Sequence, residues 1–376
     1  MTKLRVGIIG CGNISTSYLG LAPMFKSLEL KSVADINMEA ARTRAAEYNL
    51  RAETVDDLLA APDVDVIVNL TVPAVHYEVT RRILEAGKHA YSEKPLVLSL
   101  DEGQALRDLA ASKGLRVGSA PDTFLGGAHQ LARASIDEGA VGRIVGGTAH
   151  VMGHGMEAWH PNPDFFFKPG GGPILDMGPY YVTNLIQLIG PVTAVTAMAK
   201  ASFATRTIGN GPRDGEVLDV ETPTNIHAIL EFANGAIVTL GASWDVWANR
   251  HPNMELYGSE GSLYVPDPNF FGGAVELAAP DGSVTELPGR GHPFGINNQE
   301  GHGVWRANYR CAGLADMAAA IDENRAHRCN IDVAVHAVEV LTGILKAAET
   351  QSWVNMTTTC ERPAALSPDE AKALLA

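Results

Sequence analysis

The chain has 376 residues, of which 46% are hydrophobic and 19% charged, and its 43 acidic against 29 basic residues give a formal net charge of −14 at pH 7. This charge disfavours binding to nucleic acid and to anionic membrane surfaces, and the length predicts two domains of roughly 100–200 residues each. The start of the chain shows no signal-peptide pattern, and the apolar stretch at 64–75 is interrupted by Asp65, Asn69 and Pro73. We therefore expect a soluble protein of the cytoplasm that binds no membrane.

The first third of the sequence alternates between short apolar runs and helical patterns. The runs that suit buried strands lie at 4–9, 30–34, 64–70, 88–91 and 115–118. The helical patterns between them lie at 14–26, 38–48, 74–86 and 100–113. Such alternation predicts a parallel sheet covered by helices.

Beyond residue 121 the pattern changes. A helix is predicted near 128–138, and stretches rich in β-branched residues follow at 142–152, 191–199, 226–232 and 236–244. Turn signals stand at 234–235 and 281–282, and helical spacing returns at 304–323 and 333–350. The predicted fold class is α/β, with a Rossmann-type parallel-sheet domain over residues 1–121 and an α/β domain with a large, mostly antiparallel open sheet over residues 122–376.

A glycine turn joins the first predicted strand to the first helix, with the pattern Gly10-x-Gly12-x-x-Ser15. Glycines at such a turn let the backbone approach a dinucleotide pyrophosphate. Asp35 ends the second strand, where its carboxylate can accept hydrogen bonds from ribose hydroxyls and repel a 2′-phosphate; the alternative is a cap for the helix that begins near Met38. This order of elements favours NAD over NADP, and Arg42 is the base that could reverse the preference.

Several segments together carry a family resemblance. They are LTVPAVHYEV (70–79), AYSEKPLVLS (90–99), GGGPILDMGPYYVTNLIQLIG (170–190) and the segment 307–341. With the glycine turn, they resemble the Gfo/Idh/MocA oxidoreductases, which include glucose-fructose oxidoreductase and inositol dehydrogenase. The resemblance implies bound NAD, a sugar pocket between the two domains, and a homo-dimer or homo-tetramer formed through the second sheet. The cofactor-binding residues that we predict are Gly10, Gly12, Asn13, Ile14, Asp35, Thr71, Pro73, His76, Glu93 and Lys94.

The predicted catalytic residues are Lys94, Asp176 and Tyr180. An ammonium near a reacting sugar hydroxyl stabilises negative charge on its oxygen, and we expect burial to lower the pKa of Lys94 toward the working range. The resemblance implies that Asp176 accepts a substrate hydroxyl and that the Lys94–Pro95 bond is cis. Family members commonly carry histidine four positions after this aspartate, and Tyr180 stands there instead. Tyr181 is the alternative proton carrier. Both tyrosines are predicted to contact the substrate, together with Lys94 and Asp176.

The Gly/Pro-rich connection 153–173 is the predicted substrate loop, in which His154, Trp159 and His160 suit recognition of a sugar. Together with His150 these histidines could suggest a metal site, but no carboxylate or cysteine at fixed spacing completes one, so no metal is predicted. The family resemblance suggests that three further residues form a pocket wall, and the alternative is a helix-capping and surface role: His302, Tyr309 and Arg310. The four cysteines lie far apart and are predicted to be free thiols.

The predicted activity is NAD-dependent oxidation of a ring CH–OH of a sugar or glycoside to a keto-sugar. Two alternatives remain. One is an NAD-dependent glycosidase or lyase that oxidises its sugar transiently and eliminates the aglycone, and the other is a non-catalytic NAD-binding regulator. Net formation of NADH separates the first two classes.

Overall fold

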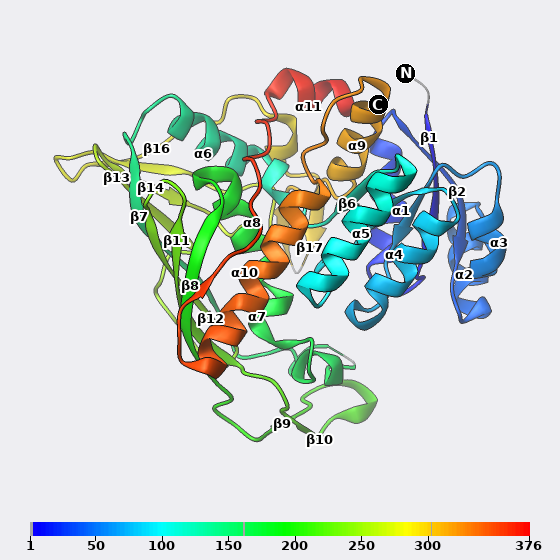
Figure 1. Ribbon diagram of the computed structural model, residues 1–376, viewed down its shortest axis with the longest axis horizontal. Coiled ribbons are helices and arrows are strands. Elements are labelled where there is room, and N and C mark those ends of the chain that lie inside the picture. Colours follow the sequence, from blue (N-terminus) through cyan, green and yellow to red (C-terminus); the bar gives the residue numbers. More distant parts are fainter. Residues whose placement is uncertain (1–2, 161, 302) are drawn as a thin grey trace.

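The computed structural model describes residues 3–160, 162–301 and 303–376, which form two domains around two large sheets (Figure 1). The first sheet has six parallel strands in the order β3-β2-β1-β4-β5-β6. Its strands are β1 (Leu4–Ile9), β2 (Leu28–Ala34), β3 (Arg51–Glu53), β4 (Val66–Asn69), β5 (His89–Ser92) and β6 (Val117–Ser119). This is the strand order of dinucleotide-binding domains, so the predicted Rossmann-type sheet is confirmed.

Helices cover both faces of this sheet. One face packs against α1 (Ser15–Leu21), α2 (Met38–Tyr48), α9 (Ala312–Asp322) and α11 (Pro368–Leu374). The other face packs against α3 (Val55–Ala60), α4 (His76–Glu85), α5 (Leu100–Lys113) and part of α10 (Ile331–Thr350). Neither β3 nor α3 was predicted, because three and six residues are too few to show the period of a strand or a helix.

The second sheet has nine strands in the order β16-β15-β14-β13-β7-β12-β11-β8-β19, of which only β7 and β12 pair in parallel. The strands are β7 (Ile144–Met152), β8 (Val192–Lys200), β11 (Asn225–Phe232), β12 (Ile237–Ser243), β13 (Met254–Gly258), β14 (Ser262–Val265), β15 (Glu276–Ala278), β16 (Val284–Glu286) and β19 (Val354–Asn355). The predicted large, mostly antiparallel sheet is therefore confirmed.

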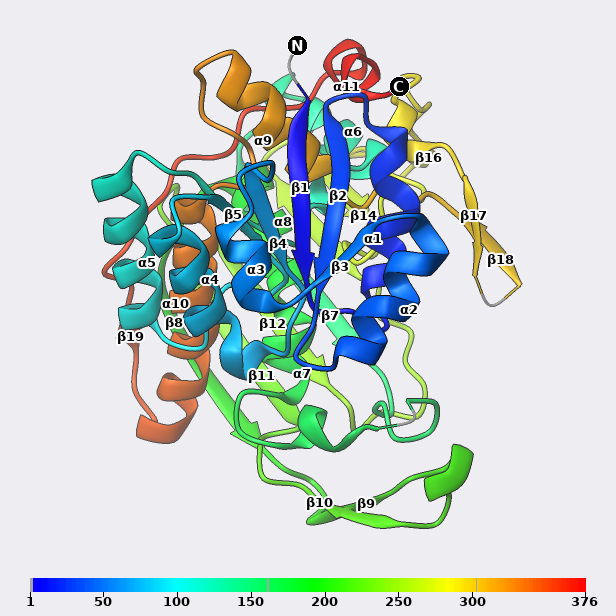
Figure 2. The same ribbon diagram turned by 90° about the vertical axis from the view of Figure 1, so that its right-hand side faces the viewer.

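One face of this second sheet packs against α6 (Gly127–Asp137), α8 (Gly178–Ile189) and most of α10, and α7 (Gly172–Asp176) directly precedes α8. Two small hairpins project from the body: β9 (Thr205–Thr207) with β10 (Val217–Asp219), and β17 (Gln299–Gly301) with β18 (Val304–Arg306), both visible in Figure 2. The turns predicted at 234–235 and 281–282 are confirmed. Gly235 and Gly282 adopt φ values of 84° and 85°, and each lies between two paired strands.

Helix α10 connects the two cores. Its residues Val335 and Val338 belong to the core of the first sheet, whereas Val340 and Ile344 belong to that of the second. The domain boundary at residue 121 stays a prediction. Helices α9 and α11 belong by sequence to the predicted second domain, but they pack in the core of the first sheet.

Two predicted helices are wrong in part. The helix predicted over 14–26 ends at Leu21 and continues as a short 3₁₀ turn that contains Pro23. The helix predicted over 304–323 begins only at Ala312, because 304–306 pairs with 299–301 and because Cys311 has a φ of 84°, which a right-handed helix cannot contain.

A buried ion pair fastens α9 to the C-terminal segment. Asp316, which is fully buried, accepts hydrogen bonds from Arg328 Nη1 (2.5 Å) and Arg328 N (2.6 Å) at its two oxygens, and Arg325 Nη2 donates at 2.9 Å. Arg328 also donates to the carbonyl of Ala365 (2.8 Å). The pair therefore holds the returning chain against the first domain.

Replacing Asp316 with asparagine should destabilise the fold by about 3–5 kcal/mol, because the change removes the buried carboxylate and leaves the buried Arg328 with only the exposed Glu370 as an ion-pair partner. Urea unfolding at pH 7 measures the free energy. The exposed neighbour Glu323 pairs with Arg325 at the surface, so Glu323→Gln, the matched control, should change stability by about 1 kcal/mol or less. Equal effects of the two substitutions would show that the buried pair has no special structural role.

Candidate active site

The predicted cofactor residues gather along one edge of the first sheet. Gly10 follows β1, Asp35 follows β2, Thr71 follows β4 and Lys94 follows β5. The strands are parallel, so these positions share the carboxyl edge of the sheet, and the strand order reverses between β1 and β4, where such folds open a crevice for ligands.

The glycine turn fits the close approach of a dinucleotide. Gly10 has a φ of 106°, and a Cβ at this position would lie 2.6 Å from the carbonyl oxygen of Leu70. Gly12 and Asn13 are exposed, and a Cβ at Gly12 would meet nothing within 4 Å, so the outer side of the turn is open. Ser15 takes the place of a third glycine and is fully buried, with its Oγ donating to the Gly12 carbonyl (2.6 Å). A small residue is what this close contact requires.

Asp35 is held beside the glycine turn. Its Oδ2 accepts from the Cys11 amide (2.7 Å) and its Oδ1 from the Asn37 amide (2.8 Å). The helix cap that sequence alone left open belongs to Asn37, whose Oδ1 accepts from the Glu39 amide (3.1 Å). Arg42 is exposed on α2. The half-buried Asp35 carboxylate keeps unused lone pairs that can receive ribose hydroxyls.

Three other predicted cofactor residues lie around this crevice at different depths. His76 is buried, with its ring nitrogens 2.7 Å from the Pro95 carbonyl and 2.9 Å from the Thr71 carbonyl, so its ring joins two loops. Burial lowers the pKa of His76 and disfavours its charged form. Ile14 and Pro73 are half-buried beside the same turns.

Glu93 faces inward. Its Oε1 accepts from the Tyr18 hydroxyl (2.9 Å) and its Oε2 from the Lys94 amide (3.0 Å), and the Lys94–Pro95 bond is cis. Tyr18 gave no signal in the sequence, because its partner is 75 positions away.

Lys94 and Asp176 bring the two domains together. Lys94 Nζ donates to Asp176 Oδ1 and to the Asp176 carbonyl oxygen, both at 2.7 Å. Asp176 is the last residue of the short helix α7, and Met177 separates it from the long apolar helix α8. An ammonium has three donors, so one N–H of Lys94 keeps no hydrogen-bond partner among the residues described.

The expected lowering of the Lys94 pKa is wrong. Burial does act to lower it, but the negative charge of Asp176, with contributions from Tyr180 and Glu93, outweighs burial and holds the pKa of Lys94 above its ordinary value. Lys94 is therefore a charged donor in this structure and not a neutral base.

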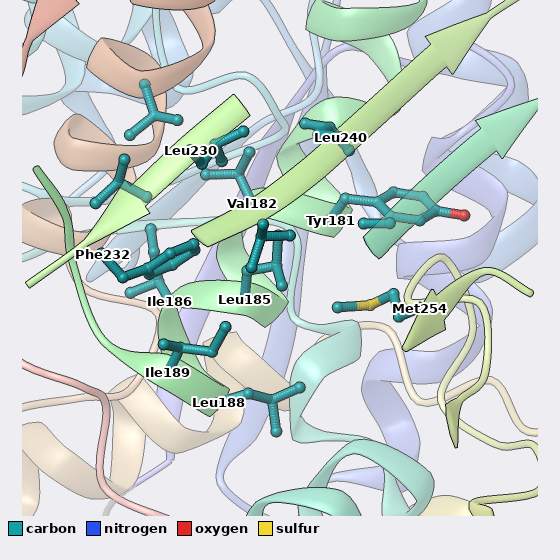
Figure 3. Packing of buried hydrophobic residues seen from close by; sticks show 14 of the residues in the cluster. Tyr181, Val182, Leu185, Ile186, Leu188, Ile189, Leu230, Phe232, Leu240 and Met254 are labelled. Atoms are coloured by element: carbon teal, nitrogen blue, oxygen red, sulfur yellow. The ribbon is translucent and has the colours of Figure 1, made fainter. Parts of the chain in front are cut away.

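Tyr180 joins this group and Tyr181 does not. The Lys94 ammonium lies 5.2 Å from the centre of the Tyr180 ring, and the Tyr180 hydroxyl accepts from Arg310 Nη2 (3.2 Å). Tyr181 points the other way into the core beneath the second sheet, beside Met254 (Figure 3), and its hydroxyl contacts Asp267 (3.3 Å). The structure therefore contradicts the predicted contact of Tyr181 with the substrate. Neighbouring residues of a helix face different directions, and Tyr181 faces the core.

The substrate loop 153–173 is fastened by the β9–β10 hairpin. Arg206, nearly fully buried, donates to Glu157 Oε1 (3.1 Å) and to the carboxylate of Asp245. The Asn210 amide donates to the carbonyls of Glu157 (3.1 Å) and His160 (3.2 Å). Arg206 and Asn210 were not predicted from the sequence. Their partners lie some 50 positions earlier, and no local motif connects the two segments.

The three residues of this loop that were predicted to bind a sugar differ in their surroundings. His154 stacks on Trp247, with ring centres 3.3 Å apart, and His160 packs edge-on against Phe166, with ring centres 5.2 Å apart. Trp159 is 61% exposed and lines a pocket of about 460 Å³. Hydrogen bonds of the described residues do not join His154 or His160 to Lys94.

Arg310 connects the pocket beside Trp159 to the cluster of Lys94, Asp176 and Tyr180. The lining residues of this pocket are Thr123, Trp159, Asn269, Phe270, Phe271, Gln299, Glu300, Arg306, Ala307, Asn308 and Arg310. Tyr309 is buried nearby and donates to the Ile296 carbonyl (3.0 Å), and His302 lies outside the described residues. Aromatic faces and side-chain amides are the groups that bind sugar rings and hydroxyls.

Comparisons with known proteins identify the family. The description "Oxidoreductase family, NAD-binding Rossmann fold" matches residues 4–120, and "GFO/IDH/MocA C-terminal domain" matches residues 129–264. The chain belongs to the Gfo/Idh/MocA oxidoreductases. Its first sheet with helices α1 to α5 matches the NAD-binding domain of this family.

Named relatives include sugar dehydrogenases. Levoglucosan dehydrogenase of Pseudarthrobacter phenanthrenivorans is 26% identical over 95% of this chain and 99% of its own length. D-glucoside 3-dehydrogenase of Escherichia coli is 28% identical over 65% of this chain and 71% of its own length. A structure of levoglucosan dehydrogenase with NADH and L-sorbose has a TM-score of 0.79 at 23% identity, covering 95% of this chain and 99% of that one.

The described ranges also bear on metal binding, on the state of the cysteines and on membrane-spanning helices. No group of three or more histidine, cysteine, aspartate or glutamate residues there is arranged to hold a metal ion. The cysteines are all free and buried. None of the helices in these ranges is both long and apolar enough to cross a bilayer.

The position of Asp35 predicts that the protein binds NAD more tightly than NADP by at least about tenfold, because a 2′-phosphate would meet the carboxylate at close range. Dissociation constants from titration calorimetry measure the ratio. Asp35→Asn should bring the dissociation constants for NAD and NADP closer together, whereas Asp108→Asn on the exposed side of α5 should leave their ratio unchanged. Equal affinities of the unmodified protein for NAD and NADP would contradict this role of Asp35.

Proposed function

We propose that this chain is an NAD-dependent dehydrogenase that oxidises a ring CH–OH of a sugar or glycoside to a keto-sugar. The observation that carries the proposal is the convergence of Lys94, Asp176 and Tyr180, with one Lys94 N–H that has no partner among the described residues. Family membership and the sugar dehydrogenases among the relatives support it.

The residues of this chain divide the work of removing a hydroxyl proton. NAD, when bound along the Gly10–Asp35 edge, supplies the hydride acceptor. The free N–H of Lys94 binds the substrate oxygen and stabilises the negative charge that grows on it. Asp176 keeps Lys94 charged and fixes its direction. Tyr180 is the proposed proton carrier: its oxygen takes the hydroxyl proton when it is deprotonated, and in the reverse reaction its phenol O–H returns the proton.

The pocket of about 460 Å³ is the proposed sugar site. Its size falls within the range of about 300–1,000 Å³ that small-molecule sites occupy. Trp159 offers a flat apolar face to a ring, and the amides of Asn269 and Asn308 offer donors and acceptors for hydroxyls. Because Arg310 both lines the pocket and donates to Tyr180, a sugar bound there lies next to the proton carrier.

The outer face of the second sheet is the proposed contact between copies of the chain. Residues alternate along β11, and the large apolar side chains on the outer face include Met198, Ile229 and Ile237, which are 82%, 39% and 56% exposed. Such a face is typical of an oligomer interface. Sedimentation equilibrium measures the mass, and a monomer at micromolar concentration would contradict the proposal. The cytoplasmic location stays a prediction.

Lys94→Met should lower kcat by about 10²–10⁴-fold, the range for a positioned group that acts on a proton, while NAD still binds. Asp176→Asn should act mainly on KM for the sugar, and Tyr180→Phe should approach the loss of Lys94→Met. Steady-state NADH formation measures the rates, with Tyr181→Phe as the matched control. Near-normal turnover of a folded Lys94→Met variant would remove the chemical basis of the dehydrogenase.

Trp159→Ala should raise KM for the sugar by about tenfold and leave the affinity for NAD nearly unchanged, since the indole lines the sugar pocket. His160→Ala should act in the same direction by loosening the loop. Trp353→Ala, at an equally exposed tryptophan outside the loop, is the control. A large loss of thermal stability, or equal losses of NAD and sugar binding, would assign Trp159 a structural role instead.

A further inference from the structure

Arg310 occupies an unusual turn at the start of α9. The next residue, Cys311, is buried and has φ 84° and ψ −2°, a left-handed conformation that residues other than glycine rarely adopt. The Ala312 amide donates to the Tyr309 carbonyl across this turn (2.9 Å), and the Cys311 thiol lies 3.7 Å from the Tyr18 carbonyl. Backbone of this kind persists where the surrounding structure enforces it, and it occurs often at functional sites. Here it directs Arg310 toward Tyr180.

The guanidinium of Arg310 makes one side-chain hydrogen bond among the described residues, and its acceptor is the Tyr180 hydroxyl (3.2 Å). No carboxylate of these residues lies within ion-pair distance of it, in contrast to the buried Arg206 and Arg328. Burial opposes its charge, but Tyr180, Glu93, Tyr18 and Asp122 nearby hold the pKa of Arg310 above its ordinary value. Arg310 therefore stays charged and has a phenol where a half-buried arginine normally has a carboxylate.

The direction of this bond constrains the proton of Tyr180. A guanidinium has no acceptor, so the phenol oxygen must accept and its own O–H must point elsewhere. The Lys94 ammonium lies over the face of the ring, 5.2 Å from its centre. A fixed cation at hydrogen-bond distance stabilises a phenol oxygen most when that oxygen is ionised.

We propose that Arg310 is the positioning residue for proton transfer: it holds the Tyr180 ring in place and stabilises the ionised oxygen that forms when the proton is not on the phenol. The inference rests on the proposed function. It explains how tyrosine can stand where family members commonly carry histidine, because the charge that an imidazole supplies by itself comes here from a second side chain.

Other charged and titratable groups face the same cluster from each element packed around it. They are Glu93 and Lys94 after β5, Asp122 before α6, Tyr18 of α1, Asp176 of α7, Cys311 before α9, and Glu300 and Arg306 of the β17–β18 hairpin. Asp122 is the nearest competitor in the neutral range: burial raises its pKa to about 6 although the Gly313 amide donates to it (3.0 Å). A pH titration must therefore isolate Tyr180 by difference.

The first measurement is the pH titration of tyrosinate absorbance in the full-length protein with NAD bound. Subtracting the Tyr180→Phe curve from that of the unmodified protein gives the signal of Tyr180 alone. Arg310→Gln should move the midpoint of this signal upward by about one pH unit or more, and Arg310→Lys should restore part of the shift. An unchanged midpoint in both variants would overturn the proposal, and this readout needs no knowledge of the sugar.

The second measurement is a double-mutant cycle on sugar oxidation. Arg310→Gln should lower kcat by about 10–100-fold with little change in KM, but by less than about threefold in the Tyr180→Phe background. If the kcat of the double variant falls by the product of the two single losses, Arg310 does not act through Tyr180. If Arg310→Gln raises only the KM for the sugar, Arg310 is a substrate contact. Arg310→Lys, checked by thermal melting, covers the case in which the glutamine variant fails to fold. A silent Tyr180→Phe would instead contradict the proposed function.

Discussion

The contact between Lys94 and Asp176 is the interaction on which the rest of the site depends. Lys94 stands at the end of a strand of the first sheet, and Asp176 at the end of a short helix beside the second, so their bonds of 2.7 Å cross from one domain to the other. Two of the three ammonium donors are used on one residue, which fixes the direction of the third. Tyr180 follows four residues later, and the start of α8 thus places a phenol ring under the same ammonium, with its centre 5.2 Å away.

Each domain supplies a different part of the chemistry. The edge of the first sheet offers the open glycine turn and Asp35, which suit a dinucleotide. The second domain contributes the phenol and the loop with Trp159, and the buried pair of Arg206 with Glu157 holds that loop against the β9–β10 hairpin. Buried ion pairs contribute little net stability, but breaking one is costly, so we interpret Arg206 as fixing the shape of the loop.

Local patterns in the sequence predicted most of the framework. Apolar runs located the strands of the first sheet other than β3, and the spacing of Gly10, Gly12 and Asp35 predicted the cofactor edge, which stays a prediction. Lys94 and Asp176 were identified only through family resemblance, since nothing local marks two residues that are 82 positions apart as partners.

The remaining features depend on long-range packing. The sequence favoured Tyr180 and left Tyr181 as the alternative, because the choice depends on how α8 packs under the second sheet (Figure 3). It also gave the wrong direction for the pKa of Lys94, since burial was visible in the pattern but the neighbouring carboxylate was not. The bond from Arg310 to Tyr180 spans 130 positions and arises from a left-handed turn that no propensity predicts.

The most direct test of the central claim follows the hydrogen of the oxidised carbon. Sugars and glycosides deuterated at single ring carbons are incubated with the NAD-bound protein, and the nicotinamide is examined by mass spectrometry. The account predicts that deuterium from one ring position appears in NADH in proportion to the keto-sugar formed. Release of an aglycone without net NADH would indicate transient oxidation and elimination instead, and the absence of deuterium transfer from every substrate that binds would contradict the assignment of a sugar dehydrogenase.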